Sequence, residues 1–176
     1  QTDLQQRLQP INTLWMHYQT KNIRQTGNNI LFLDIKCTVK FFLVLNVSHG
    51  WTSNDVYFKD ARDPKATFAP LAVGLPAHFW VDVYKDHFYV LTDHESPHWR
   101  VARVDPKHPK LESWKTIVPE RADASIDLDN GASVVGGKLA VAYLKNATSQ
   151  LEIFDLDGKK LHDVALPGIG TMTGPL

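Results

Sequence analysis

FYVLTDHESPHWRVARVD, residues 88–105, is the stretch that decides the fold. It holds two short apolar runs, residues 88–91 and 99–104, separated by polar residues. Runs of this length that are rich in valine and aromatic residues and bounded by turn residues predict β-strands. Pro97 lies between them and cannot donate to a strand ladder, so it marks the connection. The stretch therefore predicts two neighbouring strands joined by a polar turn.

The same layout recurs before and after this stretch. Repeating units begin at Phe42, Phe88 and Leu139, which are 46 and 51 positions apart. Within each unit the second strand follows the first at a similar offset, which is 14 positions from Phe42 to Val56, 13 from Phe88 to Val101 and 14 from Leu139 to Ile153. Units of four short strands with a period of roughly 40–50 residues are typical of β-propellers. We expect an all-β fold, a partial β-propeller of about three four-stranded antiparallel blades. An ordinary antiparallel sandwich or meander is the alternative. The expected strands are residues 42–45, 55–60, 68–73 and 79–84 in the first unit, 88–91, 99–105, 114–118 and 132–135 in the second, and 139–142, 151–156 and 164–166 in the third.

Residues 1–40 differ from the repeating part. Scattered apolar residues between Leu4 and Trp15 are compatible with a short amphipathic helix, and an apolar run over residues 30–45 favours strands. We therefore divide the chain into an unassigned N-terminal segment, residues 1–40, which ends in this strand-like run, and a partial propeller, residues 41–176.

The charge and composition exclude several classes of partner. Nineteen basic and nineteen acidic residues cancel, so no long-range field favours nucleic acid or an anionic membrane. No apolar run approaches the roughly 20 residues that span a bilayer, and the first residues lack the features of a signal peptide. We expect a soluble protein. Cys37 is the only cysteine, which favours the cytoplasm and leaves the periplasm open.

Motifs for chemistry are missing from the sequence. There is no G-x-S-x-G elbow, no Walker loop and no G-x-G-x-x-G. Cys37 lies in an apolar run, where a thiol is usually a small buried hydrophobe. His94 and His98 are four residues apart, but Pro97 argues against the helix that would align them. Residues 127–131, DLDNG, lack the distal glutamate of an EF-hand loop. We therefore predict no catalytic residue, no metal site and no cofactor. An enzyme that uses Cys37 or a histidine is the weakest hypothesis.

Tryptophans 51, 80, 99 and 114 allow two interpretations. They could form a stacking platform for a ligand, or they could pack between sheets. Three of them fall in predicted strands, which favours core packing.

Several segments in order resemble the propeller domain of the prolyl oligopeptidase family. They are LVLNVSHG at residues 43–50, DVYFKD at 55–60, residues 88–104, ESWKTIVPE at 112–120 and residues 139–168. The resemblance implies a seven-bladed propeller that covers an α/β-hydrolase domain and restricts access to short peptides, which are cleaved after proline. The partners it implies are that hydrolase domain and short proline-containing peptides. The catalytic motifs of the family lie mostly in the hydrolase part and do not occur in this sequence.

The resemblance begins at about residue 41 and spans under three blades, so we expect a fragment of the substrate-gating propeller that is non-catalytic by itself. A truncated or frame-shifted reading frame would explain both ends. The family segment that corresponds to residues 48–51 can face the central cavity, so we predict that His49 and Trp51 contact substrate. An ordinary blade turn is the alternative. The other functional hypothesis is a stand-alone propeller-like interaction module, which recruits a partner or self-associates through exposed edge strands.

Overall fold

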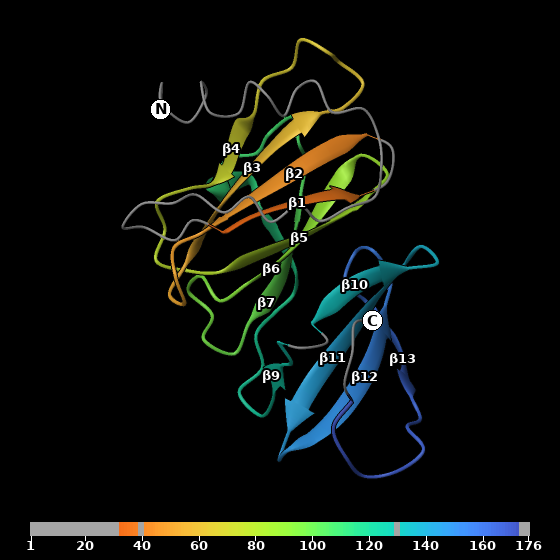
Figure 1. The fold of residues 1–176 in the computed structure, drawn as a ribbon. Coiled ribbons are helices and arrows are strands. Elements are labelled where there is room, and N and C mark those ends of the chain that lie inside the picture. The colour runs from red at the N-terminus through yellow and green to blue at the C-terminus, as the bar shows by residue number, and fades with distance from the viewer. Residues whose placement is uncertain (1–31, 39–40, 129–130, 173–176) are drawn as a thin grey trace.

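The computed structural model describes residues 32–38, 41–128 and 131–172, and for residues 32–38 it describes the backbone. These residues form three antiparallel sheets that follow one another along the chain (Figure 1). The first sheet contains, in order, β1 (Phe32–Thr38), β2 (Phe42–Ser48), β3 (Asn54–Asp60) and β4 (Ala69–Ala72). The second contains β5 (Phe79–Tyr84), β6 (His87–Thr92), β7 (Arg100–Val104) and β8 (Lys115–Val118). The third contains β10 (Ala132–Val135), β11 (Lys138–Lys145), β12 (Thr148–Phe154) and β13 (Lys160–Val164).

Two smaller elements complete the described part of the chain. A single turn of 3₁₀-helix, η2 (Leu111–Ser113), precedes β8. The short strand β9 (Ser125–Ile126) pairs with the end of β11, so the third sheet has five strands instead of the three expected in the third unit. No helix among the described residues is long and apolar enough to cross a membrane.

The predicted fold class is confirmed, but the predicted grouping of strands is wrong by one strand. Residues 79–84 form the first strand of the second sheet, not the last strand of the first. Residues 132–135 likewise open the third sheet. A repeat period is the same whichever strand is counted first, so sequence offsets fix the period and not its phase. Hydrogen bonding between β5 and β6 decides the phase.

The apolar run of residues 30–45 contains parts of two strands. β1 pairs with β2 over their whole length, from Phe32 opposite Ser48 to Thr38 opposite Phe42. The backbone of Cys37 lies opposite Leu43. The expected N-terminal helix falls on residues outside the described part, and the domain division at residue 40 stays a prediction.

Strand β6 explains why residues 88–91 are apolar without interruption. Side chains alternate across a strand, and both faces of β6 are covered. Phe88 and Val90 belong to the core between the first and second sheets. Tyr89 and Leu91 belong to the core between the second and third sheets. A strand that is buried on both faces needs a continuous apolar run, and β6 therefore holds the three sheets together.

The first core is centred on three phenylalanine rings. Phe88 is fully buried and packs edge-on against Phe42 and Phe58, with ring centroids 5.1 and 4.9 Å apart. Edge-on pairs at this separation are favourable because the positive edge of one ring meets the negative face of another. This packing fixes the first sheet on the second.

An aspartate closes the equivalent turn in each of the three sheets. The Oδ1 atoms of Asp60, Asp105 and Asp155 accept hydrogen bonds from the backbone N–H groups two residues further on, at 2.9, 2.9 and 3.0 Å. An aspartate that closes a turn onto its own backbone in this way is a common turn signal. These turns lie at one end of the sheets, so the other end is formed by a different set of loops.

Candidate functional site

The loops at that other end of the first two sheets are tied together by a buried asparagine. The side chain of Asn54, 6% exposed, accepts a hydrogen bond from the Phe79 backbone N–H at 2.7 Å and donates to the Phe79 carbonyl at 2.9 Å. Its backbone N–H donates to the Ala77 carbonyl at 3.2 Å. A fully bonded buried amide fixes the two segments relative to each other. The connection between β2 and β3, residues 49–53, is therefore held beside the start of β5.

The predicted substrate contacts, His49 and Trp51, both lie in this connection. His49 Nε2 is 3.0 Å from Asp55 Oδ2, and its side chain is about half exposed. Gly50 has φ +67°, a conformation that glycine adopts without steric cost. Trp51 is 97% exposed. A single exposed apolar side chain does not by itself indicate a binding site, so the contact of His49 and Trp51 with substrate stays a prediction.

A second group of aromatic side chains lies next to this connection. The ring of His78 stacks on Trp80 with centroids 5.7 Å apart, and Trp80 is 5.1 Å from Trp99. Trp99 is buried, as core packing predicts, whereas Trp80 is 46% exposed. Trp114 is partly buried against the first core. The interpretation as core residues therefore holds for Trp99 and Trp114 and is wrong for Trp80.

His78 connects the two groups. Its Nδ1 is 2.8 Å from Asp93 Oδ2, and its backbone N–H donates to Asp93 Oδ1 at 2.6 Å. Its Nε2 is 3.1 Å from the backbone carbonyl oxygen of Trp51. One imidazole ring thus spans from the β6–β7 connection of the second sheet to the β2–β3 connection of the first.

The β6–β7 connection, residues 93–99, is backbone-strained. Glu95 and Trp99 have φ values of +54° and +70°, which non-glycine residues adopt at a cost. The Nδ1 atom of His94 is buried and has no hydrogen-bond partner among the described residues. His98 does not face His94 on a helix; its Nδ1 contacts the Arg121 carbonyl oxygen at 2.8 Å. The surrounding contacts therefore hold this connection in a backbone conformation that is unfavourable for the isolated segment.

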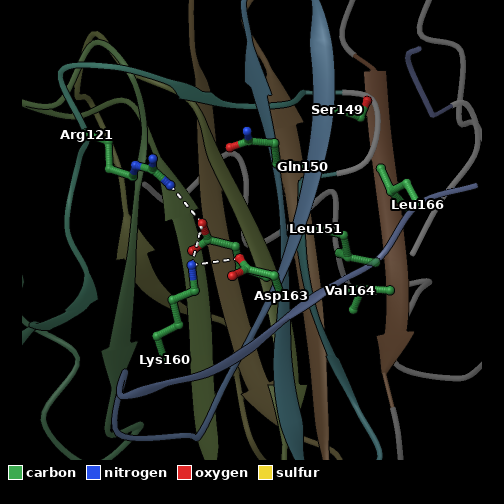
Figure 2. Close-up of a pocket in the computed structure, with 9 residues that line it drawn as sticks. Arg121, Ser149, Gln150, Leu151, Lys160, Asp163, Val164 and Leu166 are labelled. Atoms are coloured by element: carbon green, nitrogen blue, oxygen red, sulfur yellow. Dashed lines mark hydrogen bonds and ion pairs between the residues drawn. The ribbon is translucent and has the colours of Figure 1, made fainter. Parts of the chain in front are cut away.

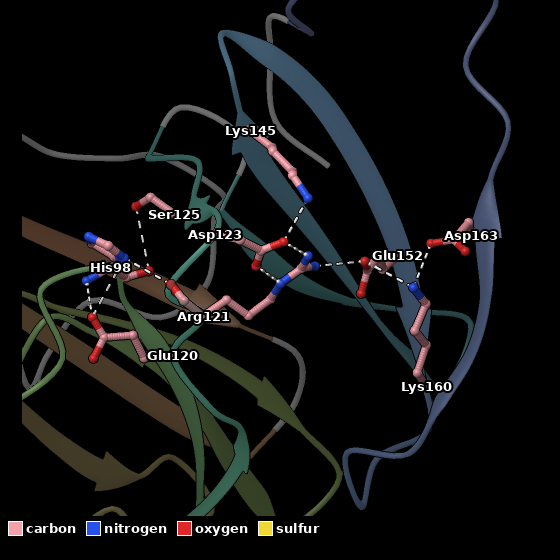
Figure 3. A network of polar contacts seen from close by, with 9 residues as sticks. All are labelled: His98, Glu120, Arg121, Asp123, Ser125, Lys145, Glu152, Lys160 and Asp163. Atoms are coloured by element: carbon pink, nitrogen blue, oxygen red, sulfur yellow. Dashed lines mark hydrogen bonds and ion pairs between the residues drawn. The ribbon is translucent and has the colours of Figure 1, made fainter.

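Arg121 is the centre of a charged network at the junction of the second and third sheets (Figure 3). Its Nε and Nη2 donate to the two carboxylate oxygens of Asp123, both at 3.0 Å, and its Nη1 donates to Glu152 Oε1 at 2.9 Å. Lys145 adds a contact to Asp123 at 2.7 Å. The pKa of Asp123 is held well below its usual range, mainly by the Arg121 hydrogen bonds and then by Lys145. Burial, and next the charge of Glu152, raises the pKa of Tyr143 to about 12.

A pocket of about 420 Å³ opens beside this network (Figure 2). Lys160 Nζ contacts Glu152 at 3.0 Å and Asp163 at 2.7 Å, so these charged walls are already paired with one another. A charged ligand would have to break an ion pair to bind here. The lining residues are Arg121, Ser149, Gln150, Leu151, Glu152, Lys160, Asp163, Val164 and Leu166.

The described residues contain no group of three or more histidine, cysteine, aspartate or glutamate side chains that could hold a metal ion. Two residues of the 127–131 segment and the side chain of Cys37 lie outside the described part. The links from His78 to Asp93 and from Arg121 to Glu152 were not found in the sequence. Their partners are 15 and 31 positions apart, and no local pattern marks such pairs.

Antiparallel sheets of four or five strands that stack face to face in chain order define part of a β-propeller. Residues 25–175 match the model of the family described as prolyl oligopeptidase, N-terminal β-propeller domain. The chain belongs to this family.

Named relatives agree with this assignment. The chain is 29% identical over 134 residues to a prolyl endopeptidase of Elizabethkingia meningoseptica and 30% identical to one of Elizabethkingia miricola. Each match covers 76% of this chain and 18% of the relative. A solved structure from a study of two prolyl endopeptidases is 41% identical with a TM-score of 0.73, over 80% of this chain and 20% of that one. Prolyl oligopeptidase B of Galerina marginata has a TM-score of 0.70 at 14% identity, which supports the fold alone. The chain thus spans about a fifth of the length of these relatives.

Proposed function

We propose that this chain forms part of the substrate-gating propeller of a prolyl oligopeptidase-like serine-type endopeptidase and is not catalytic by itself. The observation that supports it most is the 41% identity to a prolyl endopeptidase structure across 80% of the chain. The partners are an α/β-hydrolase catalytic domain and short proline-containing peptides. We propose a cytoplasmic location, which cell fractionation would test.

The proposed contact with peptide is made by Trp51 and His49. An exposed indole offers a flat apolar face to a peptide side chain at little conformational cost, because tryptophan has two side-chain torsions. The His49–Asp55 pair beside it offers a polar edge that can bond a peptide group. This combination of one aromatic face and one polar edge suits a short, proline-containing peptide without a fixed charge.

Two measurements test the proposal. A purified chain is expected to leave a proline-containing chromogenic peptide intact and to bind it, with binding followed by titration calorimetry. Trp51→Ala should weaken binding at least tenfold, whereas Leu128→Ala, which also removes an exposed apolar side chain, should not. Equal binding by both variants would contradict the Trp51 contact.

The origin of the proposed partner can be tested in the coding DNA. A G-x-S-x-G-G elbow is expected to be encoded beside the sequence for residues 1–176, in the same or in an adjoining reading frame, because a hydrolase domain needs its nucleophile on such a turn. A genomic neighbourhood without one would weaken the proposal sharply.

A second candidate function is a stand-alone interaction module. Leu144 alternates with Tyr143 on β11, so it lies on the face turned away from the second sheet, where it is 38% exposed; Val135 is 55% exposed. The edge strand β13 carries exposed Lys160, His162 and Asp163, and charges on an edge discourage strand pairing. Self-association would therefore use the apolar face. Light scattering that shows a monomer at high concentration would contradict self-association, and recruitment of a different partner would then be the version of this candidate left to test.

A further inference from the structure

We infer that His78 is a proton-dependent positioning residue that holds the β2–β3 connection, and with it Trp51, against the second sheet. Both ring nitrogens of His78 face oxygen acceptors, Asp93 Oδ2 at 2.8 Å and the Trp51 carbonyl oxygen at 3.1 Å. The ring therefore links two sheets that are otherwise joined at this end through Asn54.

The inference follows from counting protons. A neutral imidazole has one N–H donor and one lone pair. If Nδ1 donates to Asp93, the Nε2 lone pair faces the lone pairs of the Trp51 carbonyl; if Nε2 donates to Trp51, the Nδ1 lone pair faces a carboxylate. Both contacts become hydrogen bonds when the pair holds one more proton than a neutral imidazole with an ionised Asp93. The linked state thus takes up a proton, so acid favours it and rising pH releases it.

The partner on the second sheet is held more firmly than the partner on the first. Asp93 also accepts a hydrogen bond from the His78 backbone N–H at 2.6 Å, so its carboxylate contacts both the ring and the backbone of His78. The Trp51 carbonyl belongs to the β2–β3 connection, and the side chain of Trp51 itself is almost fully exposed. When the extra proton leaves, Nδ1–H keeps its bond to Asp93 and the contact to Trp51 is lost. Deprotonation therefore frees the connection that carries Trp51.

Other titratable groups lie on the elements that pack against His78. The β6–β7 connection carries Asp93, His94, Glu95 and His98, and the β2–β3 connection carries His49 with Asp55 at its end. His49 contacts Asp55 and lies two residues from Trp51 in the same connection. Within the described part of the chain, His94 Nδ1 has no hydrogen-bond partner, and His98 Nδ1 contacts the backbone carbonyl oxygen of Arg121. The His49→Gln variant is therefore the necessary control.

Two variants of His78 separate the two ring nitrogens. The amide nitrogen of His78→Asn takes the place of Nδ1, so it keeps the Asp93 contact and loses the link to Trp51. The amide nitrogen of His78→Gln takes the place of Nε2, so it keeps a donor for the Trp51 carbonyl at every pH. Neither amide titrates in the range of about pH 5 to 8 in which histidines change charge.

The test uses the whole chain labelled with 5-fluorotryptophan and followed by ¹⁹F NMR, with the Trp51 signal assigned from Trp51→Phe. In the unsubstituted chain and in His49→Gln, the Trp51 signal should sharpen and shift as the pH rises from about 5 to 8. It should be sharp throughout in His78→Asn and broad throughout in His78→Gln. The Trp114 signal, whose indole N–H donates to the Pro109 carbonyl, is the internal reference.

Three results would overturn the inference. They are a Trp51 signal that does not change with pH, a pH dependence that survives in His78→Asn, and ¹⁵N shifts of His78 that show a neutral ring at pH 5. The inference rests on the proposed function only where Trp51 is a peptide contact. If Trp51→Ala binds peptide normally while the ¹⁹F pattern is as expected, the function fails and the proton-dependent link stands.

Discussion

Gly158→Ala tests how closely the third sheet is seated on the second. Gly158 closes the turn between β12 and β13, where its N–H donates to the Asp155 carbonyl at 3.1 Å and its φ is +91°. A Cβ added here would lie 1.9 Å from the carbonyl oxygen of Ile117 and 2.6 Å from its carbonyl carbon. Both atoms are backbone atoms beside a second-sheet strand, so a side-chain rotation cannot relieve the contact. Ile117 itself is buried in the second core.

The expected cost combines two effects. Ordinary contact begins near 3.4 Å, so the turn has to move by about 1.5 Å. Overpacking of this kind costs about 1–3 kcal/mol, and the positive φ adds about 1–2 kcal/mol for an L residue. We therefore expect Gly158→Ala to lower the free energy of unfolding by about 2–5 kcal/mol, a large part of the stability of a typical domain.

The measurement is urea unfolding followed by tryptophan fluorescence and circular dichroism. Gly168→Ala is the matched control, because a Cβ there meets nothing within 4 Å and φ is not positive. Both variants change the unfolded chain alike, so the difference between them reports the folded contact. Equal unfolding midpoints for the two variants would refute the close approach of Gly158 to Ile117.

Three further predictions follow from the cores and the charged network. Phe88→Ala should lower the free energy of unfolding by about 3–5 kcal/mol, because it empties the centre of the first core, while the half-exposed Leu144→Ala should cost far less. Ultraviolet titration should show one tyrosine that ionises at about pH 12, and this step should be missing in Tyr143→Phe. Because the pKa of Tyr143 is higher in the folded than in the unfolded chain, the stability that it contributes is present below about pH 10 and is lost as the pH rises towards 12. The carboxyl of Asp123 should titrate below its usual range and move up in Arg121→Gln; a lowered pKa contributes stability above the unfolded value of about 3.9, which is lost as the pH falls below it.

Each of these predictions has a result that contradicts it. Equal destabilisation by Phe88→Ala and Leu144→Ala would mean that the first core is not packed as described. A wild-type tyrosine titration that is complete near pH 10 would exclude the buried Tyr143. Lys160 contacts Glu152 and not Asp123, so an Asp123 titration that shifts as far in Lys160→Met as in Arg121→Gln would contradict the direct role of Arg121.

The strands could be predicted because their signal is local. Residues 88–91 are apolar on both faces, and the turns that end β3, β7 and β12 carry an aspartate that bonds its own backbone. The phase of the repeat could not be predicted, because the spacing between equivalent strands is the same whichever strand opens a sheet. Pairing of Phe79 with Thr92, and not with β4, is a property of the folded sheet.

The candidate site also combines features that the sequence predicted with features that it did not. The exposure of Trp51 follows from a short turn with Gly50, and the sequence placed it correctly in a connection between strands. The partner of His78 is 15 positions away in another connection, and the neighbour that stacks on it, Trp80, looked like a core residue. Alternation of apolar and polar residues along a strand indicates that its two faces differ, but it does not indicate which face a neighbouring sheet covers.

The sequence by itself determined the strand content, the aspartate turns and the period of the repeat, because these depend on residues that are near one another along the chain. The tertiary structure decided which strand opens each sheet, which tryptophans are buried, and that one imidazole joins Asp93 to the Trp51 carbonyl. Those features depend on sheets that meet face to face, where the contacting atoms come from residues tens of positions apart and no local pattern specifies their distance.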